Sequence, residues 1–380
     1  MKISIIANHT FTAALPDDLN AVHQYGSEGM SAILASALSK SHNVDFYAPV
    51  GSSRIGNYHP TRRTDGKYLP SDLLADISLD NSKHDDLLLS EFVIDCTPWG
   101  NNIQQLALYN DYYRYLCYRL GYKDYTAPAL EPILQHHITH CDHFARLFEQ
   151  AGHPNCHVAH FGISDFWSPA RLDTPDDKYF DWIGRVTSSP YWNMTEDSPV
   201  RSYPWYYLFP HRYNREKGSF DVVKLAKEFP NRTFVFSSAA VSPDHHQALQ
   251  QLRSEAPSNC KFVQIPSSPD REFYRRELYR NAIATLAPFQ YNMNGYHDTG
   301  GILSMESIKC DTPIIVTRSE GSEEIFGHQQ DRGAVFIDGY ESLKMAIKYV
   351  DFLSLHPVEW KWSIDNYVNE YMQAIHSIIG

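Results

Sequence analysis

Short apolar segments alternate along the chain with stretches in which apolar residues recur every three or four positions. Residues 2–7 form an apolar run that predicts a buried first strand. A helix is expected next, marked by Met30, Ile33, Leu34, Ala37 and Leu38. A second strand is expected at 44–48. Strands that alternate with amphipathic helices are typical of parallel α/β construction.

The same alternation returns in the second half of the chain. Strands are expected at 180–183, 233–236, 261–263, 282–286, 314–316 and 334–337, with helices around 222–229, 244–254, 271–279, 301–310 and 340–353. Pro and Asp residues interrupt the pattern at 168–177, which predicts a hinge there. We therefore expect an N-terminal Rossmann-like domain at 1–168 and a C-terminal one at 169–360. A C-terminal helix at 361–380 is expected to pack back toward the first domain.

Composition narrows the class of protein. The 380 residues are 43% hydrophobic, well away from the disordered regime, and 33 Lys and Arg against 45 Asp and Glu give a net charge of −12. This acidic balance argues against nucleic-acid binding by bulk charge. The six cysteines are scattered without metal-binding spacing, and no window is apolar enough for a signal peptide or a transmembrane helix. We expect a cytoplasmic protein of a bacterium or of a phage-infected cell.

The most informative segment lies between a predicted strand and a predicted helix. Asp298 precedes Gly300, Gly301, Ile302 and Leu303, whose backbone amides would open the helix and can hold a phosphate. Glu306 falls in the second helical turn. Two carboxylates beside an anion site suit the hydroxyl groups of a sugar and a ribose that flank a diphosphate. Taken alone, the segment is better explained as a plain junction with a capping acid and a solvated Glu.

Two further segments carry candidate charges and glycines. Arg185 follows the strand predicted at 180–183, and Lys217 precedes the next helix. Fixed cations at these places stabilise the charge that develops on a departing diphosphate, although surface charges often occupy such loop ends. Gly26 lies in a Gly-Ser-Glu-Gly turn that brings backbone amides near a phosphate or simply allows the turn.

Together these segments resemble the large retaining glycosyltransferase family 4, which includes glycogen and sucrose synthases and bacterial mannosyltransferases. Asp298 and Glu306 fall on its E-x7-E motif, with Asp in place of the first Glu. Residues 310–315 resemble its C-G-T-P-V-V run, 320–325 its G-G-x-x-E loop, and 160–169 its domain-junction segment. Gly184-Arg185 and Glu216-Lys217-Gly218 are similar to its G-R and E-K-G pair.

The resemblance implies a GT-B fold, two Rossmann-like domains that face each other across a cleft, and a retaining transferase that uses a nucleotide-diphosphate sugar. It implies that Arg185 and Lys217 bind the diphosphate, Asp298 the transferred sugar and Glu306 the ribose, with Arg185, Lys217 and Asp298 as the catalytic set. Gly26 and the amides of Gly300–Leu303 would complete the donor site. It further implies no metal and no cofactor, with the departing phosphate taking the acceptor proton. A UDP-sugar is the first donor to test.

The acceptor is left open by the sequence. The long 186–215 connection interleaves aromatic and basic residues, among them Tyr203, Trp205 and Arg212, which suit stacking on sugars or bases. A loop with its own small aromatic core is the alternative. The acceptor would be a glycan, a lipid or a small molecule. Residues 182–185 and this loop also resemble phage α-glucosyltransferases of hydroxymethylated DNA. A non-catalytic nucleotide-sugar-binding protein and a GT-B epimerase are the alternatives of other classes.

Overall fold

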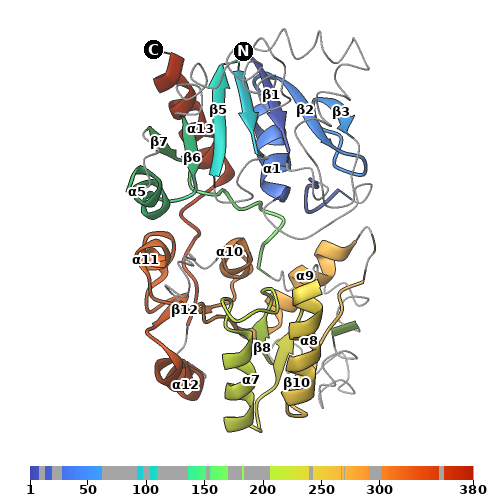
Figure 1. The fold of residues 1–380 in the computed structure, drawn as a ribbon, viewed down its shortest axis with the longest axis vertical. Coiled ribbons are helices and arrows are strands. Elements are labelled where there is room, and N and C mark those ends of the chain that lie inside the picture. Colours follow the sequence, from blue (N-terminus) through green and yellow to red (C-terminus); the bar gives the residue numbers. More distant parts are fainter. Residues whose placement is uncertain are drawn as a thin grey trace. The chain divides into compact units, whose positions relative to one another are not determined.

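The computed structural model contains two compact units, each built around its own sheet (Figure 1). It describes residues 1–7, 13–18, 28–61, 92–96, 103–108, 136–150, 155–169, 182–183, 206–238, 243–266, 268, 270–290, 301–350 and 355–379. The first unit comprises Met1–Ser164 and Trp362–Gly380, and the second comprises Asp165–Lys361. The hinge predicted at 168–177 thus begins a few residues beyond the observed boundary. None of the helices in the described residues is long and apolar enough to cross a membrane.

The first unit has a seven-stranded sheet in the described residues, ordered β3-β2-β1-β4-β5-β6-β7. Its strands are β1 (Lys2–Ile6), β2 (Asn43–Pro49), β3 (Asn57–Thr61), β4 (Phe92–Asp95), β5 (Ile103–Leu108), β6 (His137–Thr139) and β7 (Cys156–Val158). Its helices are α1 (Glu28–Leu38), α5 (Asp142–Gln150) and α13 (Ile364–Ile379). All pairings are parallel except those of β5, which runs antiparallel to β4 and to β6. The alternating pattern predicts a wholly parallel sheet, and the antiparallel strand β5 departs from that prediction.

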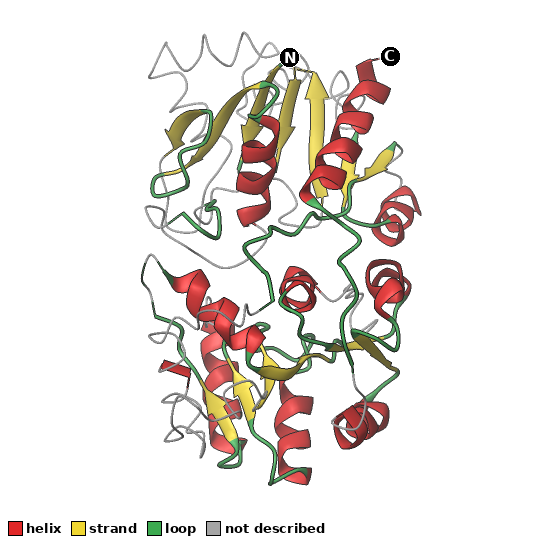
Figure 2. Cartoon of the chain, turned by 180° about the vertical axis from the view of Figure 1, so that it is seen from behind, coloured by secondary structure: helices red, strands yellow, loops and turns green. Residues whose placement is uncertain are grey.

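The last helix belongs to the first unit although it is distant in sequence. Helix α13 packs against α1 and β7, as the backbone trace in Figure 2 also shows. Its buried residues Tyr367, Tyr371, Ala374 and Ile375 recur at helical spacing, so one apolar face covers the unit. A Cβ at Gly162 would lie 2.6 Å from the Cα of Ile364, so the chain can cross the start of α13 only with glycine there.

Where it is described, the second unit has a six-stranded, wholly parallel sheet in the order β10-β9-β8-β11-β12-β13. Its strands are β8 (Tyr206–Phe209), β9 (Phe234–Phe236), β10 (Cys260–Phe262), β11 (Ala282–Ala287), β12 (Ile314–Thr317) and β13 (Ala334–Ile337). Its helices are α7 (Ser219–Glu228), α8 (Pro243–Glu255), α9 (Arg271–Arg280), α10 (Gly301–Lys309), α11 (Glu320–Phe326) and α12 (Tyr340–Tyr349). The strand order reverses between β8 and β11, and ligands of such folds bind at the carboxyl edge beside that point.

The two faces of this sheet are covered by different helices. Tyr207 and Phe209 pack into an apolar cluster with residues of α7, α8 and α12. Because successive strand residues point to opposite faces, Tyr206 points the other way, where its hydroxyl donates to the carbonyl of Leu278 in α9 at 2.8 Å. Helix α9 packs against α10 and β11 on that side.

Candidate active site

In the described part of the second unit, β8 is the first strand. The strand predicted at 180–183 is wrong at the two of its residues that the structure describes. Trp182 and Ile183 are helical, and residues 180–181 lie outside the described residues. Residues 206–209 lie in the 186–215 connection that the sequence predicts to be a loop, but they form a fully buried central strand. Five aromatic or aliphatic residues in a row, between Pro204 and Pro210, were the available signal. The neighbouring arginines and tyrosines obscured it.

This correction changes which arginine follows the strand. Arg185 lies outside the described residues and also precedes the turn that leaves β8. Arg212 occupies that turn, three residues after the strand ends and five before Lys217. Its neighbours His211 and Tyr213 are buried, whereas Arg212 is exposed. The His211 ring packs edge-on against Phe289 at 4.9 Å between centroids, so this alternation holds the guanidinium outward.

The turn itself is fixed by side-chain and backbone hydrogen bonds. The amide of Lys217 donates to Asn214 Oδ1 at 3.0 Å, and the Ser219 hydroxyl donates to the Asn214 carbonyl at 2.9 Å. Gly218 begins α7 in the left-handed conformation, with φ of 77°. A Cβ there would lie 2.1 Å from the carbonyl oxygen of Pro288, so only glycine fits.

Two further contacts attach the segment around Lys217 to the residues that follow β11. The amide of Gln290 donates to the carbonyl of Glu216 at 3.0 Å. The Lys217 ammonium lies over the ring of Phe289, 4.6 Å from its centroid, which is a cation–π distance. The ammonium is thereby held beside the switch point of the sheet, where a phosphate would meet it.

Helix α10 supplies free backbone amides at this edge. It begins at Gly301, whose φ is 70° and whose Cβ position meets no atom within 4 Å. Gly301, Ile302 and Leu303 are only partly buried, and the amides of a first helical turn have no partner within the helix. The amides that the sequence predicted for phosphate binding thus open a helix at the carboxyl end of β11. Asp298 and Gly300 lie outside the described residues, as do Gly26, Tyr203 and Trp205.

Glu306 lies in the second turn of α10, as predicted, but it is 5% exposed. One carboxylate oxygen accepts a hydrogen bond from Arg275 Nη2 at 2.8 Å, and the other accepts one from the Tyr279 hydroxyl at 3.1 Å. Burial raises the pKa of Glu306 to about 7, against the lowering effect of Arg275. The sequence did not single out Arg275 or Tyr279, since an Arg-rich helix of this composition is typically solvated.

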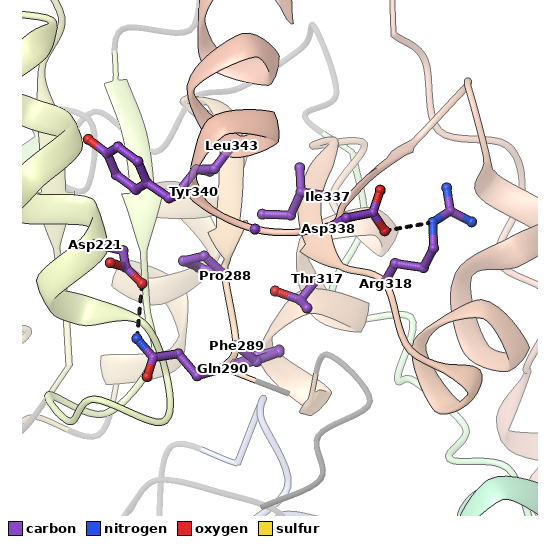
Figure 3. A pocket seen from close by; sticks show the side chains of 11 residues that line it. Asp221, Pro288, Phe289, Gln290, Thr317, Arg318, Ile337, Asp338, Tyr340 and Leu343 are labelled. Atoms are coloured by element: carbon purple, nitrogen blue, oxygen red, sulfur yellow. Dashed lines mark hydrogen bonds and ion pairs between the residues drawn. The ribbon is translucent and has the colours of Figure 1, made fainter. Parts of the chain in front are cut away.

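A pocket of about 350 Å³ adjoins the same strand ends (Figure 3). It is lined by Asp221, Pro288, Phe289, Gln290, Thr317, Arg318, Ile337, Asp338, Gly339, Tyr340 and Leu343. Gln290 donates to Asp221 at 3.1 Å, and Arg318 lies 3.3 Å from Asp338. Phe289 thus has Lys217 over its ring and also lines the pocket. The pocket presents carboxylates, an amide and a guanidinium, which suit a polyhydroxylated ligand.

Within the described ranges, no three His, Cys, Asp or Glu side chains are placed to hold a metal ion together. The candidate site of the second unit therefore consists of a basic turn, the start of α10, the Glu306 carboxylate and the adjoining polar pocket. These features belong to strands and helices that are neighbours at one edge of one sheet.

Comparison with known proteins agrees with this architecture. Residues 191–354 match the family model described as "Glycosyl transferases group 1", a range that includes Arg212 and Lys217 but not Arg185. No curated protein sequence matches the chain. Sucrose-phosphate synthase from Thermosynechococcus elongatus has a similar structure, at 12% identity and a TM-score of 0.60, over 100% of this chain and 99% of that chain.

Two other solved structures are similar over nearly the whole chain. HepE from Anabaena, in complex with UDP and glucose, has a TM-score of 0.62 and 10% identity, over 99% of this chain and 100% of that chain. AviGT4, a glycosyltransferase involved in avilamycin A biosynthesis, has a TM-score of 0.54 and 13% identity, over 100% of this chain and 98% of that chain. The chain therefore has the GT-B fold of two Rossmann-like units, and its residues 191–354 match the model of glycosyl transferases group 1.

Proposed function

We propose that this protein is a retaining, metal-independent glycosyltransferase that uses a nucleotide-diphosphate sugar, with a UDP-sugar as the first candidate. The observation that carries the proposal is the placement of Arg212, Lys217 and the start of α10 beside one switch point. Two cations and a row of free amides there suit a diphosphate. The complex of HepE with UDP and glucose supports the choice of donor, since that protein shares the fold.

In the proposed reaction, the bond between the anomeric carbon and the phosphate oxygen breaks as the acceptor oxygen bonds to the same face of that carbon. The departing phosphate oxygen takes the acceptor proton, so the nucleoside diphosphate leaves and charge is balanced. Arg212 and Lys217 stabilise the charge that develops on the diphosphate. Asp298 contacts the transferred sugar and Glu306 the ribose. Arg185 and Gly26 stay candidates for donor contact on the resemblance alone.

The acceptor supplies a hydroxyl group, and we propose a glycan, a lipid or a small molecule, with Tyr203 and Trp205 as candidates for contact. Hydroxymethylated DNA is the second acceptor to test. Since Arg212 occupies the turn beside Lys217, we assign it to the donor rather than to the acceptor.

The test is to incubate the protein with UDP-glucose and mixed acceptors and to follow UDP release and the anomeric configuration of the product by NMR. We expect transfer with retention, and a loss of about 100-fold or more in kcat/KM in Lys217→Ala and in Arg212→Ala, on the order of 3 kcal/mol each. Arg215→Ala is the matched control, because Arg215 lies in the same turn but over the ring of Phe220. Inverted product, or equal activity in all three variants, would contradict the proposal.

A further inference from the structure

Helix α9 buries charged side chains around Glu306. Arg271, Glu272, Arg275 and Glu277 are each less than 10% exposed. Arg275 Nη2 lies 2.7 Å from Glu272 and 2.8 Å from Glu306, so one guanidinium joins two carboxylates. Buried charges are costly unless they are paired and hydrogen-bonded.

The segment that begins the second unit covers this group. The Arg275 guanidinium lies over the ring of Trp167, 4.7 Å from its centroid, and Trp167 also packs edge-on against Tyr279 at 5.7 Å. Arg280 donates to the carbonyl of Ser168 at 2.8 Å, which fixes the segment on α9. Trp167 is fully buried by these contacts. It keeps water from the guanidinium and so strengthens the pairs that Arg275 makes.

We propose that Arg275 and Tyr279 are positioning residues that orient the Glu306 carboxylate toward the ribose hydroxyls of the nucleotide sugar, and that Trp167 shields the Arg275 guanidinium from water. This inference rests on the proposed function. An ionised carboxylate has about four acceptor positions, and α9 fills one on each oxygen. The remaining positions accept hydrogen bonds from two neighbouring hydroxyl groups.

The charge of the group favours such a ligand. Two carboxylates share the Arg275 guanidinium, so neither Glu272 nor Glu306 has that cation to itself. Hydroxyl donors from a ribose supply part of the missing stabilisation without adding charge. Free rotation of the Glu306 side chain would weaken its hydrogen bonds to the ribose hydroxyls. The hydrogen bonds from Arg275 and Tyr279 on α9 prevent that rotation.

The test compares the binding of UDP with that of 2′,3′-dideoxy-UDP, measured by calorimetry. The ratio of the two dissociation constants isolates the ribose hydroxyls from the diphosphate. We expect the wild type to prefer UDP by about 10-fold or more, from one or two hydrogen bonds to a charged group. Tyr279→Phe, which removes only the hydroxyl group, and Arg275→Met should each reduce the ratio several-fold. Glu306→Gln should abolish it.

Arg276→Met is the matched control, because Arg276 lies next on the same helix and donates to the carbonyl of Phe166 instead. It should lower the melting temperature and keep the wild-type ratio. If Tyr279→Phe and Arg275→Met keep that ratio while Glu306→Gln loses it, the positioning role is overturned and the proposed function stands. If Arg275→Met does not fold, Tyr279→Phe decides. If the wild type binds neither UDP nor its dideoxy analogue, the comparison is repeated with the nucleoside diphosphate that raises its melting temperature. If no nucleoside diphosphate binds, the proposed function itself fails.

Discussion

Gly218→Ala tests the claim that the basic turn is built directly on the end of β11. Gly218 has φ of 77°, and an added Cβ would lie 2.1 Å from the Pro288 carbonyl oxygen. The left-handed conformation costs a non-glycine residue about 1–2 kcal/mol. The overlap is with backbone, which cannot rotate away, so the strand end or the turn must move at a further cost of about 1–3 kcal/mol.

Gly301→Ala separates these two costs. Gly301 has a similar φ of 70°, but nothing lies within 4 Å of its Cβ position, so this variant carries the conformational cost alone. Urea unfolding followed by circular dichroism gives the comparison. At a slope of about 2 kcal/mol per molar urea, Gly218→Ala should unfold roughly 0.5–1.5 M earlier than Gly301→Ala. Equal midpoints for the two variants would refute the close approach of Gly218 to Pro288.

Three further predictions concern buried and partly buried polar groups. Asp45→Ala should cost about 3–5 kcal/mol because it removes the partner of Lys2 at 3.1 Å. Burial raises the pKa of Asp45, but hydrogen bonds from His59, Asn57 and Lys2 outweigh this and lower it, so the contribution should fade in urea titrations as the pH falls below 3.8. Asn259 donates to the carbonyls of Ala226, Phe229 and Arg232. Asn259→Asp places a carboxylate against these three carbonyls, so this variant should melt at a lower temperature than Asn259→Ala. The reverse order of melting temperatures would show that these hydrogen bonds do not form. The pKa of Glu306 is raised from 4.5 to about 7 in the folded protein, so protonated Glu306 adds to the free energy of unfolding. This added stability is fully present below pH 4.5 and is lost as the pH rises through 7. Glu306→Gln should flatten that part of the pH–stability curve, and an unchanged curve would place the titration elsewhere.

Much of the second unit follows from the hydrophobic pattern. The strands expected at 233–236, 282–286, 314–316 and 334–337 agree with β9, β11, β12 and β13 within one or two residues. The helices expected at 244–254 and 271–279 agree with α8 and α9. These segments were predictable because short apolar runs and helical periods alternate without interruption.

Three features were hidden from the pattern for physical reasons. Strand β8 is flanked by arginines and tyrosines whose polarity masks a run of four buried residues. The reversed direction of β5 depends on pairing with β4 and β6, which no local period specifies. The burial of Arg275 likewise depends on Trp167 and Glu306, far apart in the sequence. The sequence analysis named Gly301 and Lys217, which stay predictions for the donor site, but it gave Arg212 only as an acceptor candidate and missed the partners of Glu306.

The most direct test of a donor site on the second unit is thermal melting of the protein with UDP, GDP, ADP, TDP and their common sugars. A ligand that binds only the folded state stabilises it, by about 2.7 kcal/mol at a concentration 100 times its dissociation constant. We predict saturable stabilisation by one nucleotide family, strongly reduced in Lys217→Ala and in Arg212→Ala and kept in Arg215→Ala. No shift with any nucleotide at millimolar concentration, or a shift that Lys217→Ala and Arg212→Ala leave unchanged, would contradict the account.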